Sequence, residues 1–296
     1  MPVFNISDQA WMELGLPAAG FDNFGRRSYE SNRTDFKDTY GASPKSLEAM
    51  WVDLQSIGEI DDKANPYNLL VCLRWMKQYP TQKQLRGMFK EMNTHKLRDV
   101  TRFWVDRLEA LKAIKYKDIN DNDDGYMLGY TIDGTHFRIE EPRPWSTKWS
   151  SFKFGGAAAV AYEVVLKTNK LELVWLNGPF PAATHDKRIF RMFGLLDKLK
   201  LGPAGRKLIA DDGYIAVDLL EFLSLRNELD PREIQVYKER CLSRHESFNY
   251  RLKTFKCLDS RFRHGVEMHG KVTNAVAVIL LYNVDDGEPL FDPFLV

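Results

Sequence analysis

Three carboxylates in this 296-residue chain have surroundings that suit a metal-dependent reaction. Asp133 stands in GYTIDGTHFRI and Asp211 stands in LIADDGY. Each follows a short apolar run of strand type, so we expect each at or near the end of a strand. Glu246 lies in a basic, helix-periodic segment that runs from 239 to 264. Asp212, the neighbour of Asp211, is a second choice for the same role.

Carboxylates that converge on one point repel one another, and a divalent cation relieves that repulsion. Two such ions roughly 3.5–4 Å apart can activate a water molecule and stabilise the leaving oxygen of a phosphodiester. A site with only oxygen ligands favours Mg²⁺ or Mn²⁺ over zinc. If the fold brings the three acids together, they predict two divalent ions at a site for phosphodiester cleavage.

Each acid also has an ordinary structural explanation. Asp133 precedes a glycine, and Asp-Gly is a common turn pair. The aspartate pair at Asp211 could cap a following helix, and Glu246 could form a surface ion pair with Arg244 or Lys253. We prefer the joint interpretation, because the alternative requires three separate coincidences at two strand positions and one helix position.

The helical position of Glu246 bears on whether it can join the site. On an ideal helix Glu246 lies about 200° from Phe248, so it faces away from the apolar row of Phe248, Leu252 and Phe255. It shares its side of the helix with Asn249. If the phenylalanine row packs squarely on a sheet, Glu246 misses the site, whereas a tilted helix brings it in.

The middle of the chain predicts the sheet that would position these acids. Apolar runs predict a strand around Asp133, a hairpin over 154–178, a helix over 184–199 with Phe193 inward, and a short buried strand ending at Asp211. Further helices follow, and the last, over 271–284, is apolar. Strand, strand, strand, helix, strand, helix is the order of a ribonuclease-H-like α/β domain. In that order the first and fourth strands are neighbours, which would bring Asp133 and Asp211 together.

Helical periodicity dominates the residues before this sheet. We expect a loosely packed arm over 1–45, followed by helices over 43–60, 65–80, 80–92 and 94–114. A polar, acidic segment over 115–126 marks a boundary near Asn120. The predicted organisation is therefore an all-helical region over 1–119 and a ribonuclease-H-like domain, with a mixed sheet flanked by helices, over 120–296.

The last three of these helices, with their short turns, resemble a helix-turn-helix unit. In that arrangement Lys96, Arg98 and Arg102 would reach DNA phosphates or base edges. The alternative is that the helices simply cover the next domain.

The net charge of +1 hides an uneven distribution. Residues 74–117 carry 12 basic and 4 acidic side chains, a surplus of 8, and residues 231–271 carry 10 and 5, a surplus of 5. Residues 1–73 carry 6 and 11. Basic zones indicate a polyanion partner such as double-stranded DNA, although solvated helical faces have the same composition.

Further cations and the absence of other signals complete the expectations. Lys148 and Lys153, close to two tryptophans, suit phosphate contacts, as do Arg244, Arg251 and Lys253 in the second basic zone. The 3 cysteines do not make a disulfide framework or a zinc cluster. No run reaches the ~18 apolar residues that span a membrane, so no membrane partner is expected.

Four segments together resemble the DDE superfamily of transposase nucleases, in particular the PIF/Harbinger type. They are IDGTH, NGPFPAATHDKRIF, ADDGY and RHESFNYRLK with FKCLDSRFRH, within the stretch from Asp133 to the C-terminus. The separation of 35 residues between Asp211 and Glu246 is close to that of the superfamily. Ala182-Ala183-Thr184 stands where the family often has a small Gly/Ser step.

The resemblance implies a fold, an activity and a set of residue roles. It implies that Asp133, Asp211 and Glu246 bind two Mg²⁺ or Mn²⁺ ions, and that Asp186 is a recurrent acid outside this triad. It also implies a DNA substrate and nuclear residence. A homo-oligomer and a separate DNA-binding partner protein are compatible with it.

Two further functions stay open at this stage. The first is a domesticated, catalytically silent DNA-binding protein derived from a transposase, against which the three intact acids argue. The second is a nuclease acting on RNA or on DNA–RNA hybrids, since only the N-terminal helices indicate duplex DNA.

Overall fold

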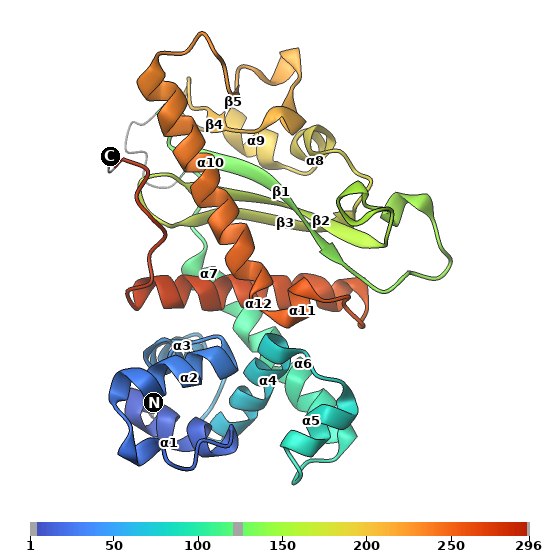
Figure 1. Ribbon diagram of the computed structural model, residues 1–296. Coiled ribbons are helices and arrows are strands. Elements are labelled where there is room, and N and C mark those ends of the chain that lie inside the picture. The colour runs from blue at the N-terminus through green and yellow to red at the C-terminus, as the bar shows by residue number, and fades with distance from the viewer. Residues whose placement is uncertain (1–4, 121–126, 295–296) are drawn as a thin grey trace. The chain divides into compact units, whose positions relative to one another are not determined.

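The computed structural model describes residues 5–120 and 127–294, apart from the side chain of Val217. By its internal contacts the chain divides into two compact units (Figure 1). The first comprises the chain up to Ala113, with Leu252–Ser260 and Lys271–Glu288. The second comprises Ile114–Arg251, Arg261–Gly270 and the chain from Pro289.

This division differs from the predicted consecutive regions over 1–119 and 120–296. Two C-terminal segments belong to the first unit, so neither unit is one continuous stretch of chain. The predicted boundary segment over 115–126 lies partly outside the described residues.

The helices and strands are defined as follows. The helices are α1 (Asp8–Ala18), α2 (Tyr29–Tyr40), α3 (Pro44–Ser56), α4 (Pro66–Gln78), α5 (Gln82–Met88), α6 (Thr94–Ala110), α7 (Lys112–Lys115), α8 (Asp186–Met192), α9 (Leu195–Lys200), α10 (Arg232–Lys253), α11 (Lys256–Asp259) and α12 (Val266–Asp285). The strands are β1 (Tyr130–Arg138), β2 (Ala159–Lys167), β3 (Leu173–Pro181), β4 (Leu208–Ile209) and β5 (Leu223–Ser224). Among the described residues, no helix is long and apolar enough to cross a membrane.

The four helices predicted over 43–114 are confirmed as α3 to α6, and their starts follow from capping chemistry. Ser43 accepts a hydrogen bond from the amide of Ser46 at the start of α3. At α5, Thr81 and Gln84 form a reciprocal capping box. These side chains satisfy amides that have no partner within the helix itself.

The prediction of a loosely packed arm over 1–45 is wrong. Helices α1 and α2 occupy this stretch, and their apolar side chains are buried in the first unit. The rings of Trp11 and Trp51 meet edge to face with centroids 5.6 Å apart, and Trp51 stacks on Trp104 at 5.7 Å. Large aromatic surfaces dominate the burial of apolar area, so Trp11 holds α1 against α3.

The sheet of the second unit has the strand order β3-β2-β1-β4-β5. β1 pairs antiparallel with β2 and β2 with β3, whereas β4 is parallel to both β1 and β5. The mixed sheet and the predicted neighbourhood of the first and fourth strands are confirmed, and with them the ribonuclease-H-like fold. The two-residue strand β5 was not predicted, because two residues carry no periodic signal.

Helices cover both faces of this sheet (Figure 1). On one face Phe190, Leu195 and Leu199 of α8 and α9 join a cluster with Ile132 of β1 and Leu208 of β4. On the other face Cys241 and Leu242 of α10 pack against Ile209 of β4. Because side chains alternate along a strand, β1 presents Ile132 and Asp133 to opposite layers.

The single helix predicted over 184–199 is two helices. Gly194 has φ 98°, in the left-handed region that glycine adopts without strain, and it separates α8 from α9. As a result Phe193 is 42% exposed instead of facing inward.

Candidate metal and nuclease site

The parallel pairing of β1 and β4 brings Asp133 and Asp211 together. Tyr130 is paired with Leu208 and Thr131 with Ile209, so the same register continued by two residues sets Asp211 level with Asp133. Asp211 follows the end of β4, as predicted, whereas Asp133 lies in the interior of the longer strand β1. Asp133 therefore lies well inside its strand and not at or near the end as predicted, and the alternative that it belongs to a turn is wrong.

Asp186, the first residue of α8, is a third carboxylate that lies close to both of these segments. A Cβ atom at Gly134 would lie 2.4 Å from its Oδ1, and one at Gly213 would lie 3.2 Å from its Oδ2. The carboxylate thus rests on the backbone of the two segments that carry Asp133 and Asp211. Glycine at 134 is what allows Asp186 to approach β1 so closely.

The electrostatics of the three aspartates reflect this crowding. Burial raises the pKa of Asp186 to about 6; the charge of Lys153 opposes the shift, and Asp133 and Asp211 add to it. Burial also raises the pKa of Asp211, and Asp133 is the next largest cause. The ionised carboxylates therefore destabilise one another, and a cation placed among them would relieve that repulsion.

Lys153 is a cation already close to this group. Its amino group donates a hydrogen bond to the carbonyl of Gly134 at 3.0 Å, and its charge lowers the pKa of both Asp186 and Asp211. Lys153 is exposed, so its amino group suits the phosphate contact predicted for this residue.

Helix α10 contacts β1 through two hydrogen bonds. His245 Nδ1 and Thr131 Oγ1 lie 2.8 Å apart, and Asn249 Nδ2 donates to Asp133 Oδ2 at 2.8 Å. The other oxygen of Asp133 accepts from the amide of Gly134 at 2.7 Å. Both oxygens of Asp133 are therefore oriented by neighbours.

Glu246 is not brought into this group. Its side chain is exposed and lines a hollow of about 530 Å³ with Tyr250, Arg251 and Phe291. The stripe of α10 that packs inward contains Phe248 and Leu252, both fully buried. The phenylalanine row thus packs inward, and it turns Glu246 outward.

Two buried polar side chains, those of Glu163 and Tyr214, lie close to the aspartates. Glu163, in register with Gly134, is 1% exposed, and its Oε2 accepts from Trp175 Nε1 at 3.0 Å. Its Oε1 and the hydroxyl of Tyr214 have no hydrogen-bond partner among the described residues. The pKa of Tyr214 is well above its usual range through burial, with Glu163 and Asp186 adding to the shift.

The second-choice acid, Asp212, and the buried His136 have other surroundings. Asp212 is exposed and begins a short 3-10 helix, and Asp211 Oδ1 caps this helix by accepting from Gly213 N at 3.0 Å. Asp211 thus has the capping role as well as its place beside Asp133. His136 Nδ1 lies 2.8 Å from Ser151 Oγ, which explains its burial.

The predicted DNA-binding residues are not all accessible. Lys96, Arg98 and Arg102 are exposed on α6, and Lys148 is exposed before β2. Arg244 is only 5% exposed and donates to the carbonyls of Phe291 and Lys167, so little of its side chain is accessible for the predicted DNA contact.

Two further predicted cations lie towards the end of α10. Arg251 is half-buried and donates to the carbonyl of Pro289 at 3.0 Å. Lys253 is half-buried, too.

The donor set fits a hard divalent cation. In the described part of the chain, no three His, Cys, Asp or Glu side chains are close enough to hold a metal ion as they stand. Mg²⁺, however, usually binds one or two carboxylates and completes its shell with water and substrate phosphate. Asp133 and Asp211 offer carboxylates of that kind, and the amide oxygen of Asn249 is buried without a hydrogen-bond partner among the described residues.

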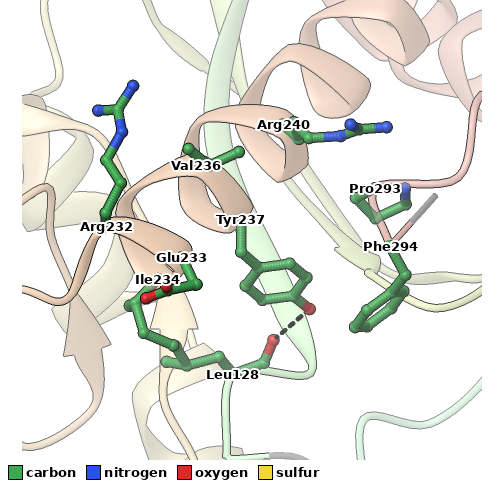
Figure 2. A pocket seen from close by; sticks show the side chains of 9 residues that line it. All are labelled: Leu128, Arg232, Glu233, Ile234, Val236, Tyr237, Arg240, Pro293 and Phe294. Atoms are coloured by element: carbon green, nitrogen blue, oxygen red, sulfur yellow. Dashed lines mark hydrogen bonds between the residues drawn. The ribbon is translucent and has the colours of Figure 1, made fainter. Parts of the chain in front are cut away.

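An apolar hollow elsewhere on the second unit does not offer paired carboxylates. It measures about 540 Å³ and is lined by Leu128, Tyr237 and Phe294 among others (Figure 2). The Tyr237 hydroxyl donates to the carbonyl of Leu128 at 3.2 Å. Of the described residues that line it, Glu233 is the one acid, so this hollow does not offer paired carboxylates.

Two residues close to the aspartates were not predicted from the sequence as site residues. Asp186 was expected outside the triad, and Asn249 was expected to have no role. The signal for Asp186 was its position before an apolar, helix-periodic run that must pack beside the strands. The position of Asn249 could have been inferred from its spacing of four residues from His245, because this spacing puts both side chains on one face of the helix.

Three comparisons with known proteins bear on the family of the chain. No curated protein matches the chain. Among solved structures, the crystal structure of a pre-cleavage Mos1 transpososome is similar at 11% identity, covering 95% of this chain and 98% of that one. Its TM-score of 0.27 is too low to carry an argument. The family described as DDE superfamily endonuclease matches residues 132–281, just over half of the chain, and the chain therefore belongs to this family.

Proposed function

We propose that this protein is a metal-dependent DNA endonuclease of the transposase type, in which Asp133 and Asp211 hold the metal. The observation that supports this most is the β1–β4 register, which, continued by two residues, would set the two carboxylates level with each other. Membership of the DDE superfamily endonucleases supports the same reaction class. The four motifs from IDGTH to RHESFNYRLK favour the PIF/Harbinger type within it.

The residues of this chain orient the reacting groups. Hydrogen bonds from Gly134 N and Asn249 Nδ2 fix both oxygens of Asp133, and Gly213 N fixes one oxygen of Asp211. Lys153 provides a positive charge for the substrate phosphate. Two Mg²⁺ or Mn²⁺ ions, when bound, would polarise the phosphodiester and lower the pKa of a water molecule.

The proposed cleavage forms a bond between the water oxygen and phosphorus and breaks the bond from phosphorus to the 3′ oxygen. The departing oxygen takes a proton, which leaves a 3′-hydroxyl and a 5′-phosphate. In a transposase that hydroxyl would then attack target DNA in a second in-line displacement.

The proposed substrate is duplex DNA, and the exposed cations of α6 would contact it. A homo-oligomer, a separate DNA-binding partner protein and nuclear residence are predictions that accompany the transposase proposal and rest on the resemblance.

The variant Asp133→Ala tests the proposal. We expect calorimetric titration with Mn²⁺ or Mg²⁺ to show loss of binding, and a plasmid assay to show loss of nicking, while duplex DNA binding is retained. Asp212→Ala, at the exposed neighbour of Asp211, is the matched control and should keep both metal binding and plasmid nicking. Normal cutting by the Asp133 variant would refute the assignment.

One observation favours a second candidate, a domesticated DNA-binding protein that no longer cuts. Glu246, the expected third acid, is turned away from the two aspartates. In this case the wild-type protein would bind duplex DNA, but it would neither bind Mn²⁺ nor nick the plasmid.

A further inference from the structure

A polar hollow of the second unit lies beyond the end of β1. It measures about 850 Å³, within the roughly 300–1,000 Å³ of small-molecule sites. Residues from two segments, 139–145 and 261–266, line it, and both segments belong to the second unit. Three arginines, two glutamates and a tryptophan are among these residues: Arg143, Arg261, Arg263, Glu140, Glu141 and Trp145.

The pairing of the two segments presents two of the arginines to solvent. Ile139 and Phe262 form a parallel bridge, and the amide of Glu140 donates to the carbonyl of Phe262 at 2.8 Å. Phe262 is fully buried, whereas its neighbours Arg261 and Arg263 are both exposed. This alternation is expected of a bridged, extended segment. The backbone thus sets two guanidinium groups on the exposed side of one short stretch.

Trp145 adds an exposed aromatic ring to the same hollow. Its side chain is 46% exposed, whereas Trp11 and Trp104, which serve the core of the first unit, are almost fully buried. Pro142 and Pro144 restrict the backbone just before it. Nucleic-acid bases stack on aromatic side chains of this kind, and nearby arginines strengthen the contact. The ring therefore suits a base as its partner.

The charges of the hollow match the other parts of a nucleotide. Guanidinium groups such as those of Arg143, Arg261 and Arg263 bind phosphate with two parallel hydrogen bonds. Glu140 and Glu141 can accept hydrogen bonds, and the exocyclic amino groups of adenine, cytosine and guanine donate them. A simple anion would offer nothing to the two carboxylates, whereas a nucleotide offers a phosphate, a ring face and an amino group.

We propose that this hollow binds an unpaired nucleotide, with its base stacked on Trp145 and its phosphate at Arg261 and Arg263. The inference rests on the DNA substrate of the proposed function. Within a duplex, neighbouring bases cover both faces of a base, and its partner occupies its pairing edge. Only an unpaired base offers a free face and free amino groups together. The protein would then contact duplex DNA through α6 and an unpaired strand through this hollow.

Fluorescence anisotropy in buffer with EDTA, where no cleavage takes place, tests the stacking contact. Three labelled ligands share one duplex and end bluntly, in a short single-stranded overhang, or in the same overhang without bases. Wild type should bind the overhang with bases roughly tenfold more tightly than the abasic one, as expected for a stacked base. Trp145→Ala should lose this preference, Trp145→Phe should keep most of it, and both should bind the blunt duplex like wild type.

The double variant Arg261→Ala with Arg263→Ala tests the phosphate contacts. Each contact to a single strand contributes about 0.7 to the slope of log affinity against log salt, so the slope for the overhang with bases should fall by up to ~1.4. The matched control is Arg226→Ala with Arg232→Ala, which removes two exposed arginines before and at the start of α10. It changes the charge equally and should keep the wild-type slope.

The preference for bases over an abasic strand separates stacking from a structural role, which would affect both ligands alike. Equal binding of the two overhangs by wild type would overturn the inference, as would a preference that survives in Trp145→Ala or a wild-type slope in the Arg261 and Arg263 variant. Thermal unfolding shows whether each variant is folded, and the exposed arginines keep the test decisive if Trp145→Ala is not.

The proposed function is tested separately, by plasmid nicking. A wild-type protein that nicks DNA without preferring the overhang with bases keeps the proposed function and loses this inference. A protein that shows the preference but does not nick keeps the inference and loses the nuclease.

Discussion

Glu163 shows how the fold treats a carboxyl group that it buries beside the acidic site. Burial raises its pKa to about 8; the hydrogen bond from Trp175 opposes this shift, and the charge of Asp186 adds to it. At neutral pH the folded protein therefore keeps this carboxyl largely protonated. Its neutral form avoids adding a fourth negative charge next to Asp133, Asp186 and Asp211.

This shift makes stability depend on pH. Between its ordinary value of 4.5 and about 8, the folded state keeps a proton on Glu163 that the unfolded chain releases. The contribution of Glu163 is therefore most favourable at low pH and is lost as pH rises, by up to ~1.4 kcal/mol per pH unit. Glu163→Gln cannot titrate, so its free energy of unfolding should fall less than that of wild type between pH 5 and pH 8.

Urea unfolding at both pH values measures this difference. Glu239→Gln, at an exposed position of α10, is the control and should follow wild type. A constant gap between Glu163→Gln and wild type across the range would show that Glu163 is ionised in the folded protein.

At this scale the sequence predicts some site residues and not others. Asp133 and Asp211 were predictable, because each stands in or just after an apolar run that must become a buried strand. The contact of Asn249 with Asp133 was not predictable, since it depends on the register between α10 and β1. The outward position of Glu246 was one of two open alternatives, and the burial of Phe248 and Leu252 decides between them.

Among the elements, α6 is the one on which the prediction of DNA contact depends. Lys96, Arg98 and Arg102 are exposed on it, and Arg98 is 3.8 Å from Asp99 in an exposed pair of little energetic weight. Each phosphate contact releases counterions, so it contributes about 0.9 to the slope of log affinity against log salt. Replacing all three residues by alanine should weaken duplex binding and reduce this slope by up to ~3.

Fluorescence anisotropy with a labelled duplex at several salt concentrations measures both quantities. Lys45→Ala removes an exposed lysine at α3, near Asp286, and is the matched control. An unchanged slope in the triple variant would favour the alternative prediction, in which these helices only cover the next domain.

Elements differ in how far local sequence determines them. Helices α3 to α6 begin at capping residues and carry regular apolar spacing, so they were predictable. Helix α2 was missed because its apolar side chains are few, although Phe36 and Tyr40 stand one helical turn apart. Helix α1 was missed although its buried residues Trp11, Met12 and Leu16 recur at helical spacing. The break at Gly194 was missed because periodicity continues across it while the backbone turns left-handed.

For the whole molecule, the most important feature is that the packing of the first unit includes a segment from near the C-terminus. Asn283 accepts from the amide of Ser43 and donates to the carbonyl of Gly41. Asp286 pairs with Arg33, and the Tyr282 hydroxyl donates to Asp53. Segment 271–288 therefore completes the packing of the N-terminal helices.

A polypeptide limited to residues 1–119 should consequently fold poorly. It lacks Asn283 and Asp286, which leaves buried polar groups of the N-terminal helices unpaired, at roughly 1–3 kcal/mol each. We expect no cooperative transition in thermal circular dichroism. The same residues joined by a flexible linker to 252–288 should unfold sharply, and equal unfolding temperatures for the two polypeptides would contradict this.

The interleaved path of the chain also constrains how such a protein can change by inheritance. The polypeptide passes between the two units five times, at 113/114, 251/252, 260/261, 270/271 and 288/289. A single recombination breakpoint therefore cannot exchange one unit and leave the other whole. Both units should accordingly be passed on as one gene segment, since exchange of either unit alone would need several breakpoints.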